Sequence, residues 1–153
     1  MTKPAFETGT FSFLNANSRQ EKPRTQGITE IRGPYYTPMG PRYLSDVLET
    51  MGHYVDSLKF AGGSFALMPE ETLREILDLA HQYDVLVSTG GFMEYVLTQG
   101  SDAVDQYIEA CKDVGFDIIE LSAGFISLPT EDWLALIDRV QQAGLKAKPE
   151  VGI

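Results

Sequence analysis

The sequence has little cysteine and no long apolar run. Cys111 is the only cysteine among 153 residues, so no disulfide can form within the chain, and a reducing compartment is the simplest expectation. The first residues lack the apolar core of a secretory signal, and no stretch is long and apolar enough to span a bilayer. These features predict a cytoplasmic protein without a membrane partner.

Positive charge is also scarce. Lysine and arginine number 12 against 22 aspartates and glutamates, which gives a formal net charge of -10. The field around such a protein repels phosphate backbones, so nucleic acid is a poor partner. A small anion can still bind where a lysine or a divalent cation reverses the sign locally. We therefore expect a small anionic substrate and no nucleic acid.

Several common catalytic patterns are missing. The glycine-rich stretch AGGSF, residues 61–65, matches neither the dinucleotide-binding nor the Walker pattern, and Gly62 and Gly63 stay candidates only for contacting a substrate. His53 and His81 stand alone, with no second ligand at metal spacing and no nucleophile beside them. The sequence therefore gives no support to a Ser-His-Asp or Cys-His mechanism.

From Gly27 onward, short β-type runs alternate with amphipathic helical stretches, which is typical of a parallel sheet built from strand-helix units. The predicted strands lie in GITEI, VDSLKF, DVLVSTG, FDIIELS and LKAKPEVG. The predicted helices lie near residues 41–52, 69–82, 101–114 and 130–143. Residues 1–21 are polar and without period, and predict a flexible N-terminal arm ahead of a domain at 22–153.

The predicted strands begin about every thirty residues, the length of one strand-helix unit. A closed (β/α)₈ barrel needs eight such units and about 250 residues, so the sequence supplies roughly half of one. The predicted fold is the N-terminal portion of a TIM barrel, and an open five-stranded doubly wound sheet is the alternative. The unpaired edges of a partial barrel would favour a homo-oligomer.

Polar residues at the carboxyl ends of the strands are the candidates for a site, because ligands bind there in both architectures. Lys59 lies among apolar neighbours and needs a counter-charge or a ligand. Alternation places Glu120 and Ser122 on one face of the fourth strand, and Lys148 and Glu150 on one face of the fifth. Such lysines and glutamates can polarise a carboxylate or phosphate, directly or through a divalent cation, or they can simply pair with each other.

The stretches KPR, GIT, LKFAGG, STGG, FDIIELSAG and KPEVG, in this order over residues 22–153, resemble the phosphosulfolactate synthase family. That family is similar in fold to the aldolase-type TIM barrels. The resemblance implies a lyase that adds sulfite to phosphoenolpyruvate with Mg²⁺, on the route to coenzyme M. TEIRGPYYT and LKAKPE look more like the eukaryotic branch, which includes plant heat-stress-associated relatives.

The residues and the resemblance together predict the roles of the site residues. The predicted catalytic residues are Lys59, Glu120 and Glu150. Glu120 and Glu150 are also the predicted Mg²⁺ ligands. The predicted substrate-binding residues are Gly62, Gly63, Ser122 and Lys148.

Two residues depart from the synthase pattern. Ala123 lies where the synthases tend to carry an acid, and Ile153 lies where they carry a lysine. These departures support an alternative in which this branch is a non-enzymatic stress-associated or interaction protein that keeps the barrel scaffold. The loops after strands seven and eight often hold phosphate in TIM barrels, and without them we expect the 153-residue chain to be inactive by itself.

Overall fold

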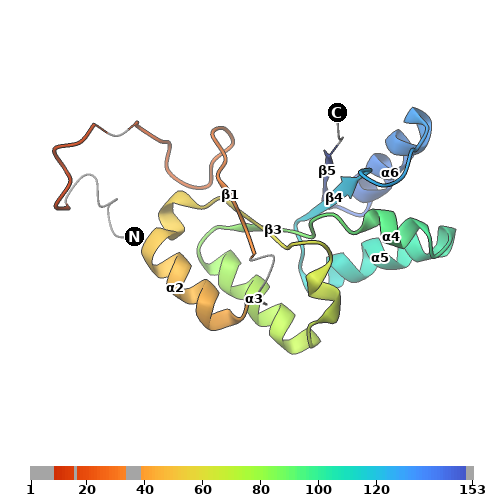
Figure 1. Cartoon of the computed structure of the whole chain (residues 1–153), viewed down its shortest axis with the longest axis horizontal. Coiled ribbons are helices and arrows are strands. Elements are labelled where there is room, and N and C mark those ends of the chain that lie inside the picture. Colours follow the sequence, from red (N-terminus) through yellow and green to blue (C-terminus); the bar gives the residue numbers. More distant parts are fainter. Residues whose placement is uncertain (1–8, 16, 34–38, 151–153) are drawn as a thin grey trace.

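The computed structural model describes residues 9–15, 17–33 and 39–150, and their five strands form one parallel sheet (Figure 1). The strands pair in the order β1-β2-β3-β4-β5, with every neighbouring pair parallel. They are β1 (Glu30–Arg32), β2 (Ser57–Lys59), β3 (Leu86–Ser88), β4 (Ile118–Ser122) and β5 (Lys146–Glu150). A doubly wound sheet requires a reversal of strand order, so the sequential order excludes that alternative and agrees with part of a barrel.

Helices fill every connection between successive strands. They are α2 (Pro41–Met51), α3 (Glu70–Gln82), α4 (Met93–Leu97), α5 (Ser101–Val114) and α6 (Thr130–Gln142), with 3₁₀ turns η1 (Gly52–Tyr54) and η2 (Ser64–Leu67). The four long helices confirm the predicted ones to within one residue at either end, whereas the short α4 was not predicted. No helix in the described ranges is long and apolar enough to cross a membrane.

The two faces of the sheet differ in chemistry. Leu58, Val87, Ile119 and Leu121 point toward the helices and are buried in the hydrophobic core. They pack there with helix residues that include Leu44, Leu48, Ile76, Leu77, Ile108, Leu136 and Val140. The alternate strand residues lie on the other face, which would be the interior of a closed barrel and is mostly polar.

Asp56, just before β2, forms ion pairs and a hydrogen bond with the segment that precedes β1. Its carboxylate lies 2.7 Å from Nη1 of Arg24 and 3.2 Å from Nη2 of Arg19, and it accepts a 2.9 Å hydrogen bond from the backbone N–H of Thr29. Arg19 belongs to the predicted arm, of which residues 1–8 and 16 lie outside the described ranges. Burial alone would raise the pKa of Asp56. The hydrogen bonds from Thr29 and Arg24 lower this pKa by more, so it ends below its ordinary value.

We predict that Asp56→Asn lowers the free energy of unfolding by about 2 to 4 kcal/mol at pH 7, because it leaves the nearly buried guanidinium of Arg24 without its counter-charge. A carboxylate whose folded pKa is depressed stabilises the fold above its unfolded pKa, near 4, and loses this effect as the pH falls through the folded value. The difference between Asp56→Asn and the unaltered protein should therefore shrink toward pH 2 in urea unfolding curves. A difference that is the same at pH 7 and pH 2 would contradict this account of Asp56.

Gly90 lies just beyond β3, where the chain passes very close to the end of β2. Its φ is +66°, and a Cβ added there would lie 1.9 Å from the carbonyl oxygen of Phe60. Gly100 also has a positive φ, of +107°, but a Cβ there would meet no atom within 4 Å. Both glycines have a backbone conformation that disfavours a side chain, but only Gly90 also lacks the space for one. Comparing alanine variants at the two positions therefore distinguishes the cost of conformation from the cost of the clash.

Gly90→Ala should lower the free energy of unfolding by more than about 4 kcal/mol, because it adds a backbone clash to an unfavourable φ. Gly100→Ala, the matched control, should cost about 1 to 2 kcal/mol, from conformation alone. Urea unfolding followed by circular dichroism measures both. An equal loss of unfolding free energy in the two variants would contradict the close approach of Gly90 to the backbone of Phe60.

Candidate active site at the carboxyl ends of the strands

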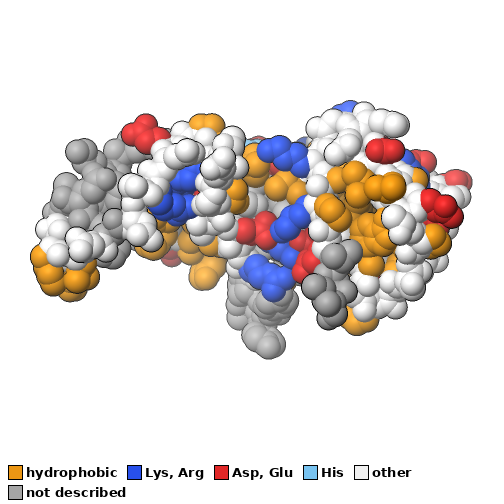
Figure 2. Space-filling view, turned by 90° about the horizontal axis from the view of Figure 1, so that it is seen from above, with side chains coloured by type: hydrophobic (Ala, Val, Ile, Leu, Met, Phe, Trp, Pro, Cys, Tyr) orange, Lys and Arg blue, Asp and Glu red, His pale blue; other side chains and the backbone are white. Residues whose placement is uncertain are grey.

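Five charged side chains meet on the polar face of the sheet. The ammonium of Lys59 contacts the carboxylate of Glu120 and lies 3.0 Å from Oε2 of Glu150. The ammonium of Lys148 lies 2.6 Å from Oε1 of Glu30 and 3.3 Å from Oε2 of Glu120. Seen from above, acidic and basic side chains alternate across the middle of the molecule (Figure 2). We call these five residues the charged network.

Strand register brings the predicted site residues of β4 and β5 together. Glu120 is paired with Lys148, and Ser122 is paired with Glu150. Paired residues of parallel strands point to the same side of a sheet, so all four lie on the polar face. The predicted shared faces of these two strands are confirmed.

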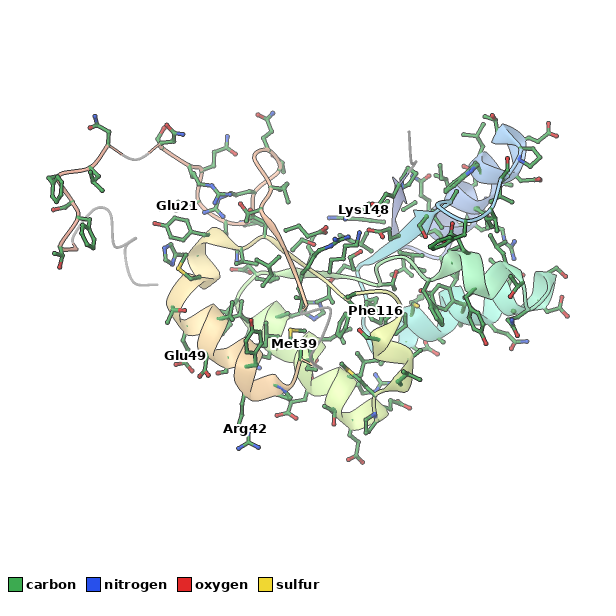
Figure 3. The ribbon with its side chains drawn as sticks, in the orientation of Figure 1. Glu21, Met39, Arg42, Glu49, Phe116 and Lys148 are labelled. Carbon is green, nitrogen blue, oxygen red and sulfur yellow. The ribbon has the colours of Figure 1, made fainter. Side chains whose placement is uncertain are left out.

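Glu30 was not predicted as a site residue. It lies on β1, at the opposite edge of the sheet from β5, and Lys148 extends from β5 across the polar face to reach it (Figure 3). Oγ of Ser57 on β2 also donates a 3.1 Å hydrogen bond to Glu30. The alternation of Glu30 and Arg32 around Ile31 was the sequence signal for a polar face on β1.

The two carboxylates that contact Lys59 differ in how deeply they are buried. The side chains of Lys59 and Glu120 are 6% and 1% exposed, whereas that of Glu150 is 52% exposed. Burial raises the pKa of Glu120 above its ordinary value, although Lys59 acts against this. Hydrogen bonds with Glu120 and Lys59 lower the pKa of Glu150. Two acids with pKa values pushed apart are a pattern typical of an acid and base pair.

Lys59 itself stays charged. Burial lowers the pKa of its ammonium, but the hydrogen bonds and negative charge of Glu120 and Glu150 raise it by more, and it ends above the ordinary value. A protonated amine that is itself almost fully removed from water gives a fixed positive charge whose field is weakly screened. The polar face therefore offers a local cationic group on a strongly acidic protein.

The loops after β3 and β4 lie beside the network. A Cβ on Gly91 would lie 3.1 Å from Oγ of Ser122 and 3.6 Å from Oε1 of Glu120, so this glycine leaves space next to both. Oε1 of Glu94, at the start of α4, accepts a 2.7 Å hydrogen bond from the backbone N–H of Phe125, which holds the loop after β4 against this helix. Glu94 is thus a positioning residue for the loop that follows Ser122, the last residue of β4.

Gly62 and Gly63 lie in the turn after β2, with φ angles of +51° and +74°. A Cβ on Gly63 would come within 2.1 Å of the Phe92 ring, whereas a Cβ on Gly62 would meet nothing within 4 Å. Packing against Phe92 and the turn conformation account for Gly63 without a ligand. The substrate-binding role of both glycines stays a prediction.

The described residues do not fit the expected Mg²⁺ site. In residues 9–15, 17–33 and 39–150, no three side chains of His, Cys, Asp or Glu gather closely enough to hold a metal ion. The two predicted ligands, Glu120 and Glu150, both contact the ammonium of Lys59, whose charge would repel a cation at that point.

The sequence has clear relatives among known proteins. It is 42% identical over 138 residues to Protein HEAT-STRESS-ASSOCIATED 32 from Arabidopsis thaliana, an alignment that covers 90% of this chain and 48% of that one. It is 32% identical over 142 residues to a phosphosulfolactate synthase from Methanothermobacter thermautotrophicus, with 93% and 53% covered. A phosphosulfolactate synthase from Methanocaldococcus jannaschii is 27% identical over 113 residues, with 73% and 44% covered. The chain spans about half the length of these curated relatives.

Among solved structures, N-acetylneuraminate lyase from Mycoplasma synoviae overlaps 72% of this chain and 38% of that one. The TM-score is 0.41 and the identity 15%, a likeness too weak to support an argument.

The family comparison covers most of the sequence. The model for (2R)-phospho-3-sulfolactate synthase (ComA) matches residues 17–153, which include all five strands and every member of the charged network. Together with the sequential strand order, this match confirms that the sheet is part of a TIM barrel. The chain belongs to the (2R)-phospho-3-sulfolactate synthase family.

Proposed function

We propose that the charged network is one side of the active site of a lyase that adds sulfite to phosphoenolpyruvate, forming phosphosulfolactate. The observation that supports this most is the buried Lys59, held between two carboxylates at the carboxyl ends of the strands in a member of this family. The proposal concerns a complete barrel, to which the five described strands contribute one wall. We expect no turnover by the 153-residue chain alone.

The proposed reaction joins two anions. The sulfur lone pair of sulfite forms a bond to the methylene carbon of phosphoenolpyruvate. The electrons of the double bond move onto the neighbouring carbon and its carboxylate, and that carbon then takes up one proton. Negative charge grows on the substrate carboxylate during this step, so fixed positive charge beside it lowers the barrier.

The proposed reaction requires fixed positive charge and a proton donor, and the charged network has groups for both. The ammonium groups of Lys59 and Lys148 would stabilise the carboxylate and phosphate of the substrate. Glu120, with its pKa raised by burial, would supply the proton, and the more exposed Glu150 would exchange protons with solvent. Ser122, beside the space left by Gly91, would bind a substrate oxygen. No step is assigned to Mg²⁺, because the network does not fit that ion.

We predict that Lys59→Met in the complete protein lowers kcat/KM for sulfite addition by about 10²- to 10³-fold, the usual loss when one charge-stabilising group is removed. Lys146→Met is the matched control, because Lys146 is an exposed lysine of the same strand as Lys148 and Glu150, and makes no ion pair within the described residues. It should keep activity within about twofold. Phosphorus NMR measures product, with the Methanothermobacter thermautotrophicus synthase as positive control. An active Lys59→Met protein would remove Lys59 from the mechanism.

A second candidate function is a non-enzymatic role in the stress response or in protein interaction. It is favoured by the higher identity to the plant heat-stress-associated protein, 42%, than to the two synthases, 32% and 27%, and by Ala123 in the loop after β4. Under this alternative the complete protein would form no product and bind no phosphoenolpyruvate, while the archaeal synthase turns over under the same conditions. Both functions are proposed for the cytoplasm.

A further inference from the structure

The ammonium of Lys59 lies between two carboxylates, in the kind of position that a bound metal cation occupies in other proteins. It contacts Glu120 from β4 and lies 3.0 Å from Glu150 of β5, so carboxylates from two different strands converge on one positive centre. Its side chain is 6% exposed, and Glu120 is 1% exposed. Convergence of carboxylates from separate strands on one centre, here a buried Glu120 and a half-exposed Glu150, is the arrangement that proteins also use to bind divalent cations.

The ammonium is held there by the fold. The neighbours of Lys59 in sequence, Leu58 and Phe60, are 0% and 1% exposed and belong to the hydrophobic core. The stem of Lys59 therefore starts from an anchored strand, and its charge cannot leave the network without losing both counter-charges. Moving a buried ammonium away from its carboxylates is strongly unfavourable, so a metal ion would have to supply that cost as well as its own dehydration.

Lys148 strengthens the same effect on the other side of Glu120. Its ammonium lies 3.3 Å from Oε2 of Glu120 and 2.6 Å from Oε1 of Glu30. Glu120 thus faces two ammonium groups, and a divalent ion bound there would be close to both.

We infer that the ammonium of Lys59 takes the place of a divalent cation between Glu120 and Glu150, and that the charged network of this protein binds no Mg²⁺. The positive charge of the site is then covalently built in and does not depend on metal supply. This inference rests on the geometry of the network and not on the proposed reaction, so a metal-binding measurement tests it whether or not sulfite addition occurs.

The experiment uses Mn²⁺ alone, followed by its electron paramagnetic resonance signal, on the 153-residue protein at pH 8. The unaltered protein should show no network-dependent binding below about 1 mM. Lys59→Ala removes the ammonium, leaves room for a hydrated ion, and should bind Mn²⁺ at least tenfold more tightly than the unaltered protein. Lys59→Gln, which fills more of the space, tests the same gain if the alanine variant does not fold. Lys146→Ala is the control and should behave as the unaltered protein does.

Two results would overturn the inference. The first is Mn²⁺ binding by the unaltered protein that Glu120→Gln abolishes, because the network would then hold a metal beside Lys59. The second is a folded Lys59→Ala or Lys59→Gln protein that binds Mn²⁺ no better than the unaltered protein does. A gain in Mn²⁺ binding that disappears in the double variant with Glu120→Gln would support the inference directly.

Discussion

A lysine ammonium and a glutamate carboxylate, both almost completely removed from water, meet on the inner face of the sheet. Lys59 comes from β2 and Glu120 from β4, so the pair spans the strand between them. Removing two charges from water is costly, and the cost is offset only when further partners surround the pair. Glu150 supplies a second acceptor for Lys59, and Lys148 a second cation for Glu120. The arrangement of the whole polar face follows from satisfying this one pair.

The two faces of the sheet carry different kinds of side chain: apolar core residues on one and charged residues on the other. The face toward the helices carries the apolar core, and the Asp56 cluster fastens the preceding segment at the amino-terminal end of β2. The opposite face carries buried charges, which apolar side chains of similar size could often replace without loss of stability. We interpret their presence as a requirement of the site, in keeping with a TIM barrel, where ligands bind at the carboxyl ends of the strands.

The sequence predicted those features that depend on local periodicity. The long helices show an amphipathic repeat, and alternation along a single strand was enough to place Glu120 and Lys148 on the polar face. Contacts across many residues could not be predicted in this way. Alternation does not say how far a side chain reaches, so the pairing of Lys148 with Glu30 was missed. For Glu120 the sequence allowed both a metal and an ion pair with Lys59, because alternation shows which side chains share a face but not which of them are in contact.

Lys59 and Glu120 form one desolvated pair in which each side chain depends on the other, and a double-mutant cycle can test this claim. Free energies of unfolding would be measured at pH 7 for Lys59→Met, Glu120→Gln and the double variant. Each single variant leaves a buried group without its partner and should cost about 3 kcal/mol. The double variant should cost less than the sum of the two by about 2 kcal/mol. Costs that simply add would contradict the claim, because they would show that the two side chains do not depend on each other.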